Sequence, residues 1–262
     1  MNEKLQQQKE LLSPPGDTIQ ETLDHLNMSQ AELAKRMGRP KEKINDLIKG
    51  REPLTRNTAL LLERVLGIPV SFWMNRENEY REELMRIEQQ EFLENSIEWA
   101  RQFPLANLKK LGYLPTTSKQ TEIVEALLKF FGVGSPDQWN KTYLDNRVSA
   151  AFKVSQASTL SPHAISAWLR IGELKAIEME LPAYNYQRFT QYLSEIKTIA
   201  FSQPENFKDR LQSICAKAGV AVVFTRDLPK APVSGATWWI NQNPIIQLSG
   251  RYKTNDHFWF AF

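Results

Sequence analysis

The spacing of apolar residues predicts that the N-terminal quarter of the chain consists of short helices. Ile19, Leu23 and Leu26 recur at intervals of three or four residues, which places them on one face of a helix. Three further stretches show helical spacing, and each ends at a glycine, the residue that most often terminates a helix: "MSQAELAKRMG", "RPKEKINDLIKG" and "LTRNTALLLERVLG". We therefore expect four short helices in this region.

The residues at the start of these stretches predict where the helices begin. Asp17, Ser29 and Thr55 each precede an apolar run, where a side-chain oxygen can accept a hydrogen bond from a free backbone N–H. Glu32 stands three residues after Ser29, which is the spacing of a capping box. A longer, polar helix is expected from near Ser71, and it would carry the chain out of the first domain.

The pattern changes in the last part of the chain. From about residue 104 to 200 the period stays helical, with Pro and Gly between the segments. After a helix that ends at Gly219, short apolar and β-branched runs predict a buried strand followed by a hairpin: "VAVVFT", "ATWWIN" and "IIQLS". A further helix is expected from Thr254 or Asn255. The sequence thus predicts a small α/β unit that is begun and not completed.

Charge is distributed unevenly along the chain. The net charge is only +3, but residues 28–56 carry eight cationic and four acidic side chains, a local charge of +4. Residues 77–98 carry eight Glu and two Arg, a local charge of −6. A basic segment beside an acidic helix favours a polyanionic partner for the basic segment, although solvated helix faces would give the same counts.

Composition narrows the cellular setting. The polar start "MNEKLQQQKELLS" has no apolar core of a signal peptide, and no apolar run approaches the length of a membrane span. Cys215 is the single cysteine, so no internal disulfide can form, and the simplest role for it is a small core residue. We expect a cytoplasmic protein without a membrane partner.

The stretches that follow Met28 and Gly38 carry the strongest functional pattern. A helix, a short turn at Gly38 and Arg39, and a second helix with a polar, basic outer face form the helix-turn-helix pattern. The second helix should point Ile44 and Leu47, with Ile48, toward the core. Its polar side chains are then left to face the major groove of DNA, although a helical hairpin used only for protein contacts is the alternative.

The chemistry of the individual side chains indicates which DNA groups they suit. Lys41 can donate to guanine O6 and N7, and Asn45 can pair with adenine. Glu42 or Asp46 can accept from cytosine N4, whereas residues at helix ends and turns suit phosphates. The expected DNA-contacting set is Gln30, Arg39, Lys41, Glu42, Lys43, Asn45, Asp46, Lys49, Arg51 and Arg56.

The motif "SQAELAKRMG…KINDLIKGREPLTRNTALLLERVLG" resembles the XRE, phage-repressor-like helix-turn-helix family. The preceding "PPGDTIQETL" and following "IPVSFWMN" are similar to HigA-like antitoxins, and the resemblance covers roughly residues 13–80. It implies a domain that binds operator DNA as a homodimer, represses its own toxin–antitoxin operon and neutralises a protein toxin. Acidic residues at two outward positions depart from this pattern and weaken non-specific affinity.

The remainder of the chain resembles regulators that fuse an XRE domain to an ImmA/IrrE-type metallopeptidase-like domain. The resemblance is carried by "FPLANLKKLGYL", "LLKFFGV", "AWLRIGELKA" and the run from Ala218 to Phe262. In that family the counterpart of "DHFWFAF" leads into a helix with a His-Glu-x-x-His zinc motif, in which the two His bind the metal and the Glu acts as the base. The sequence contains none of that motif.

No other residues are spaced to replace the missing zinc ligands. The histidines, His25, His163 and His257, lie in three separate segments. Asp256 and His257 are adjacent, and adjacent helical residues point in different directions. We therefore expect no catalytic residue, no bound metal and no cofactor, and the chain is expected not to be an enzyme.

These patterns, with the two resemblances, predict a mainly α protein with a five-helix, λ-repressor-like N-terminal domain, a helical middle region and a small incomplete C-terminal α/β unit. The expected divisions are a flexible segment 1–12, a helix-turn-helix DNA-binding domain 13–75, a polar linker helix 76–103, a helical middle domain 104–200 and a truncated ImmA/IrrE-like α/β unit 201–262.

Three functions follow from this organisation. The leading hypothesis is a sequence-specific transcriptional regulator, the antitoxin of a toxin–antitoxin operon. The alternative is a fragment of a zinc metallopeptidase-type regulator whose catalytic helix is missing from this chain. A third hypothesis is a protein-binding module in which residues 95–200 engage a toxin or sense a signal.

Overall fold

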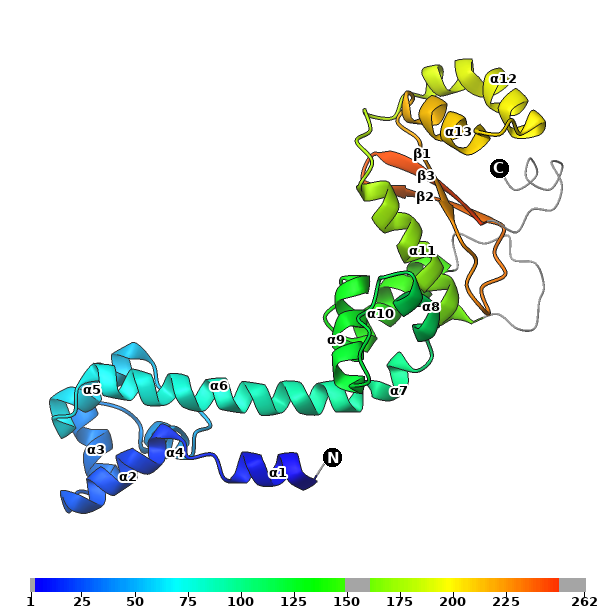
Figure 1. Ribbon diagram of the computed structural model, residues 1–262. Helices are drawn as coiled ribbons and strands as arrows, with labels where there is room; N and C mark the ends of the chain where they lie inside the picture. The colour runs from blue at the N-terminus through cyan, green and yellow to red at the C-terminus, as the bar shows by residue number, and fades with distance from the viewer. Residues whose placement is uncertain (1–2, 149–160, 250–262) are drawn as a thin grey trace. The chain divides into compact units, whose positions relative to one another are not determined.

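The computed structural model describes residues 3–148 and 161–249 and divides the chain into two compact units, 1–95 and 96–262. In the described part of the first unit, all regular secondary structure is helical. Its helices are α1 Glu3–Glu10, α2 Pro15–His25, α3 Gln30–Met37, α4 Lys41–Ile48, α5 Arg56–Leu66 and α6 Val70–Asn95 (Figure 1). The four predicted short helices are thus α2 to α5, and the longer polar helix is α6.

The core of the first unit forms where the inward faces of α2 to α6 meet. Leu23, Leu33, Leu62 and Trp73 are fully buried in one cluster, and the Trp73 indole Nε1 donates to the Ile68 carbonyl at 3.1 Å. A buried Trp contributes a large apolar area and needs a partner for its N–H, and this contact supplies both. The start of α6 is therefore part of the domain core.

Several predicted helix ends are confirmed. The Ser29 and Thr55 hydroxyls accept from the backbone N–H groups of the residues three positions later, and Gly38 and Gly67 end α3 and α5 in the left-handed conformation. The cap predicted at Asp17 is wrong, because α2 begins earlier, at Pro15. Proline suits the first turn of a helix, where its missing N–H costs no hydrogen bond.

The N-terminal residues expected to be flexible contain α1. Leu5 is buried, α1 lies against α6, and Lys9 Nζ is 3.1 Å from Glu88 Oε1 on α6. Helix α6 therefore provides this segment with a surface to pack on and with an acidic partner for Lys9. Leu26, expected on the inward face of α2, is instead exposed, because α2 ends at His25.

The second unit contains a small sheet between helices. Its helices are α7 Ile97–Ala100, α8 Leu105–Lys110, α9 Gln120–Phe131, α10 Pro136–Trp139, the π-helix Asn140–Val148, α11 Pro162–Ile177, α12 Tyr186–Ser202 and α13 Phe207–Ala216. Its strands are β1 Ala221–Thr225, β2 Gly235–Ile240 and β3 Asn243–Ser249, as the apolar and β-branched runs in the sequence predict. The mainly α fold with a small C-terminal sheet is confirmed.

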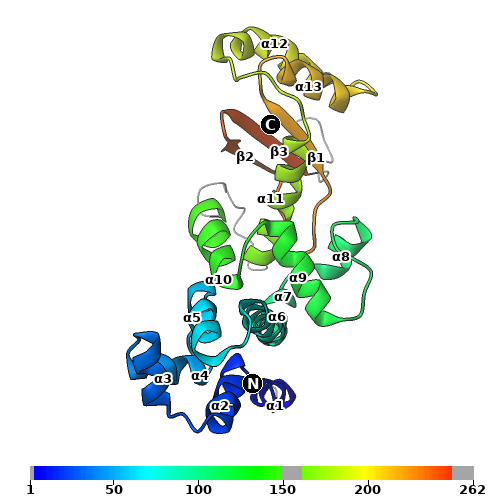
Figure 2. The same cartoon turned by 90° about the vertical axis from the view of Figure 1, so that its left-hand side faces the viewer.

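The strands are ordered β1-β3-β2, with β1 parallel and β2 antiparallel to β3. Because successive side chains on a strand point to opposite faces, each face of the sheet buries its own set. Val222 and Leu248 pack with α12 and α13, whereas Val223 and Ile245 pack with Ala176 of α11. The sheet thus lies between α11 on one face and the α12–α13 pair on the other (Figure 2).

The division of the chain differs from the sequence-based boundaries. The break in contacts falls between Asn95 and Ser96, so α6 belongs to the first unit and the predicted linker 76–103 is divided. No break falls at residue 200, because α11 packs on β1 and β3. The helix expected from Thr254 lies outside the described residues, as do Asp256 and His257.

Candidate nucleic-acid interface

The turn between α3 and α4 is built by local hydrogen bonds. Gly38 adopts a φ of +63°, and Arg39 N donates to Ala34 O at 2.9 Å, which closes α3 and redirects the chain. Pro40 precedes the first residue of α4 in an extended conformation. The short turn therefore holds α4 at a fixed angle to α3, as the helix-turn-helix pattern requires.

One face of α4 is fixed in the core and the other is free. Ile44 and Leu47 are buried, as predicted, while Ile48 is only partly buried. Lys41 and Glu42, in the first turn of α4, are exposed. The N-terminal turn of α4 thus presents charged side chains on a rigid support, which is the arrangement that can read base edges in a major groove.

Helix α4 also approaches α2 very closely. A Cβ placed on Gly16 would lie 1.9 Å from the carbonyl oxygen of Ile48, an impossible distance for two non-bonded atoms. Only glycine at this position permits the N-terminus of α2 to lie against the C-terminal end of α4. The orientation of α4 is therefore determined at both of its ends.

Two of the expected DNA-contacting cations have acidic partners. Lys43 Nζ lies 2.9 Å from Glu52 Oε2, and this hydrogen bond raises the pKa of Lys43. Arg51 Nη1 lies 3.8 Å from Asp46 Oδ1. All four side chains are at least 39% exposed, so water screens both pairs and a phosphate can replace either carboxylate.

The other predicted residues lie at helix ends and in the turn between helices, except for Asn45, which lies within α4. Arg39 lies in the turn, Lys49 follows the last residue of α4, and Arg56 opens α5; all three are exposed. Asn45 is partly buried. The structure therefore gathers the predicted set onto α3, α4, α5 and the segments that connect them.

Gln20 is a candidate that sequence reasoning missed. Gln30 Nε2, at the first position of α3, donates to Gln20 Oε1 at 2.8 Å, and Gln20 Nε2 donates to Asp24 Oδ1 at 2.7 Å. The amide of Gln30 is thus oriented by α2. The sequence did offer a signal for Gln20. It directly follows Ile19, which is buried, so the side chain of Gln20 lies at the edge of the inward face of α2.

Glu77 and Arg81 of α6 were also missed, because they lie far along the chain from the motif. Arg81 Nη2 donates to the carbonyl of Gly50 at 3.2 Å, and its Nε donates to Glu77 Oε1 at 2.7 Å. Glu77 is buried. This pair fixes the segment after α4 to the long helix.

The described residues that were considered for catalysis or metal binding form no metal-binding group. Across residues 3–148 and 161–249, no group of three or more His, Cys, Asp or Glu side chains lies close enough to hold a metal ion. His163 stacks on Trp139 with ring centroids 4.6 Å apart, and burial lowers its pKa. Cys215 is buried as predicted, and burial raises the pKa of its thiol to about 12, which leaves it unreactive at neutral pH.

Helix α6 is the longest helix in the described part of the chain, and it is strongly polar. None of the helices in that part is both long and apolar enough to traverse a lipid bilayer.

Residues 19–73 match the sequence profile of a family described as helix-turn-helix. An uncharacterised HTH-type transcriptional regulator of Escherichia coli K12, YddM, is 39% identical over 64 residues, which are 24% of this chain and 68% of that protein. A solved structure from Coxiella burnetii, described as an addiction module antidote protein of a HigA family, is 28% identical; the match covers 31% of this chain and 89% of that chain, with a TM-score of 0.29. By its likeness to YddM and its match to the profile, this chain belongs to the helix-turn-helix family of transcriptional regulators.

Proposed function

We propose that this protein is a sequence-specific DNA-binding repressor that inserts the N-terminal turns of α4 into the major groove of an operator. The observation that carries the proposal is the exposed pair Lys41 and Glu42 at the start of a helix whose opposite face, through Ile44 and Leu47, is fully anchored in the core. Base reading requires side chains that reach out from a rigid helix, and α4 has this form.

The surrounding cations complete the proposed contact. Arg39, Lys49, Arg51 and Arg56 stand at helix ends and turns, from which they can bind the phosphates on either side of the groove. Lys43 joins them once a phosphate replaces Glu52. Phosphate contacts supply most of the affinity, so binding should weaken steeply as salt rises.

Operator binding is proposed to involve a homodimer. A single α4 covers few base pairs, and family members place two recognition helices about 34 Å apart on successive turns of a palindromic site.

A gel shift of the protein on a fragment of its own promoter tests the proposed DNA contact. Lys41→Ala with Lys43→Ala should abolish the shift, whereas Lys110→Ala with Lys217→Ala, which removes two exposed lysines of the second unit, should preserve it. Equal affinity of both variants would remove the assignment.

We further propose that the protein is an antitoxin that represses its own operon. The support is the resemblance of residues 13–80, including "PPGDTIQETL" and "IPVSFWMN", to HigA-like antitoxins. In this role it would bind a small basic toxin encoded beside it. Co-expression with the neighbouring open reading frame tests this role, because an antitoxin must co-purify with that product and relieve its growth inhibition. If the two proteins did not co-purify and growth inhibition were not relieved, the antitoxin role would be refuted and only the role as a regulator would stand.

A further inference from the structure

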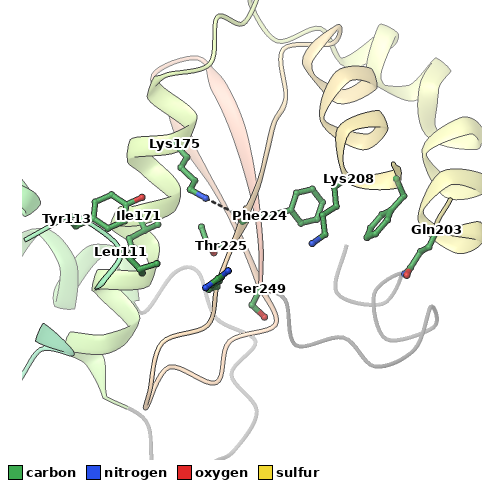
Figure 3. Close-up of a pocket in the computed structure, with 11 residues that line it drawn as sticks. Leu111, Tyr113, Ile171, Lys175, Gln203, Lys208, Phe224, Thr225 and Ser249 are labelled. Carbon is green, nitrogen blue, oxygen red and sulfur yellow. Dashed lines mark hydrogen bonds between the residues drawn. The ribbon is translucent and has the colours of Figure 1, made fainter. Parts of the chain in front are cut away.

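A cavity in the second unit lies at the carboxyl ends of the two parallel strands. It encloses about 600 Å³, within the usual range for small-molecule sites. Thr225 ends β1, Ser249 ends β3, and the two residues are register partners. In sheets with parallel strands, ligands bind beyond the carboxyl ends, because the strands end there and leave space between the flanking helices. The cavity occupies this position (Figure 3).

The lining of the cavity is strongly cationic. Lys175 from α11, Lys208 from α13 and Arg226 directly after β1 all line it, and none of the eleven lining residues that the structure describes is Asp or Glu. Lys175 Nζ donates to the Phe224 carbonyl at 2.9 Å, which holds the ammonium beside the strand end while leaving further protons to donate. Three cations from three elements, with no carboxylate among the described lining residues, favour an anionic ligand.

A buried hydroxyl points to a polar ligand. Ser249 is fully buried, and its Oγ has no hydrogen-bond partner in the part of the chain that the structure describes. The neighbouring Thr225 Oγ1 accepts from Gln247 Nε2 at 2.9 Å, so its own proton remains to be donated. A buried polar atom without a partner costs free energy, and a ligand that bonds it recovers that cost. Ser249 lies at the cavity wall (Figure 3).

The remaining walls are aromatic and apolar. The rings of Phe207 and Phe224 meet edge to face with centroids 6.2 Å apart, and Lys208 Nζ lies 5.4 Å from the centroid of Phe224. Tyr113 and Ile171 line the side away from Phe224 and Lys208 (Figure 3). Flat rings and aliphatic side chains favour a planar, apolar group in the ligand.

We propose that this cavity binds a small molecule that joins a phosphate-type anion to a planar aromatic ring, the chemistry of a nucleoside monophosphate. Lys175, Lys208 and Arg226 hold the anion, the hydroxyls of Thr225 and Ser249 bond its polar edge, and the Phe207–Phe224 pair covers the ring. The site lies wholly within residues 96–262, so the proposal does not depend on DNA binding.

Calorimetric titration of the full chain with AMP tests the proposal, with adenosine and inorganic phosphate as separate arms. AMP should bind about tenfold or more tightly than either fragment, because each fragment satisfies only one part of the site. Binding of AMP and adenosine with equal affinity would overturn the anion site. If inorganic phosphate bound as tightly as AMP, the proposed site for the ring would be overturned. If none of the three compounds gave a heat of binding, the whole proposal would be overturned.

Matched variants separate the cavity from general surface charge. Lys208→Ala with Arg226→Ala should weaken AMP binding about tenfold or more, whereas Lys217→Ala with Arg210→Ala, exposed and outside the cavity, should leave it unchanged. Equal effects would contradict the proposal. The operator gel shift of the first double variant should match that of wild type, which keeps a failure here distinct from a failure of DNA binding.

Ser249→Ala provides a second, independent readout. Removing a buried hydroxyl that lacks a partner should preserve or raise the melting temperature of the free protein, yet it should weaken AMP binding severalfold. A lowered melting temperature with unchanged AMP affinity would show that the hydroxyl serves the fold alone and would overturn its assignment.

Discussion

The guanidinium of Arg81 joins helix α6 to the end of α4, with Nη2 donating to the Gly50 carbonyl at 3.2 Å and Nε donating to Glu77 at 2.7 Å. Glu77 is only 5% exposed, so its charge requires this partner. Tyr80 lies beside the same turn, where a Cβ on Gly50 would come within 2.9 Å of its hydroxyl. The long helix therefore holds the carboxyl end of the proposed recognition helix.

Replacement of Arg81 by Ala should destabilise the first unit, because it leaves the buried Glu77 carboxylate without its cation. The Arg81 side chain is 33% exposed, so the loss should be about 1–3 kcal/mol, below that of a fully buried pair. Arg86→Ala is the control: its ion pair with Glu83 involves a side chain that is 73% exposed and should cost less than about 0.5 kcal/mol. Urea unfolding measures both, and similar losses would contradict the role of Arg81.

Gly16→Ala should displace α4, since the added methyl group would meet the backbone of Ile48 rather than a flexible side chain. We expect a loss of stability of about 1–3 kcal/mol, as for overpacked cores, together with weaker operator binding. Gly134→Ala is the matched control, because a Cβ there meets nothing within 4 Å. A Gly16 variant with the melting temperature and operator affinity of wild type would refute the close contact.

The pairing of Lys43 with Glu52 predicts that Glu52→Gln strengthens operator binding. The change removes a carboxylate from the binding face and frees Lys43 for a phosphate, so affinity should rise severalfold. The slope of log affinity against log salt should steepen by about 1, as expected for one added phosphate contact. Fluorescence anisotropy across a salt series measures both quantities. Glu98→Gln, an exposed acid paired with Arg101 in the second unit, should leave them unchanged.

His163 predicts a loss of stability at mildly acidic pH. Burial beside Trp139 lowers its pKa in the folded state, so the unfolded chain takes up a proton first as pH falls through about 6.5. The stability that the neutral His163 gives to the folded state is present above that pH and is lost progressively below it. His163→Gln should flatten the dependence of the free energy of unfolding on pH between about 7.5 and 5. The exposed His25→Gln serves as control, and a slope unchanged by His163→Gln would rule the residue out.

The helix ends and buried helix faces of the first unit could be predicted from the sequence because they depend on local interactions. Ser29, Gly38 and Thr55 act on residues within five positions of themselves, and the period of Ile44 and Leu47 needs only the geometry of one helix. The strands were predictable for the same reason, since a short apolar, β-branched run next to turn residues is a local signal for a buried strand. The roles of the ten proposed DNA contacts stay predictions.

Other features depend on contacts between distant parts of the chain, and only the tertiary structure decided them. The sequence contains Arg81 and Gly50, but their hydrogen bond exists because the fold brings α6 beside the turn that follows α4. The sequence pattern placed a division near residue 200, whereas Ala176 of α11 packs against Val223 and Ile245 of the sheet that follows it in the chain. Likewise, Lys175, Lys208 and Ser249 have no shared spacing and meet at one cavity only once β1 and β3 pair. Periodicity reports which face of an element is buried, whereas packing alone determines what buries it.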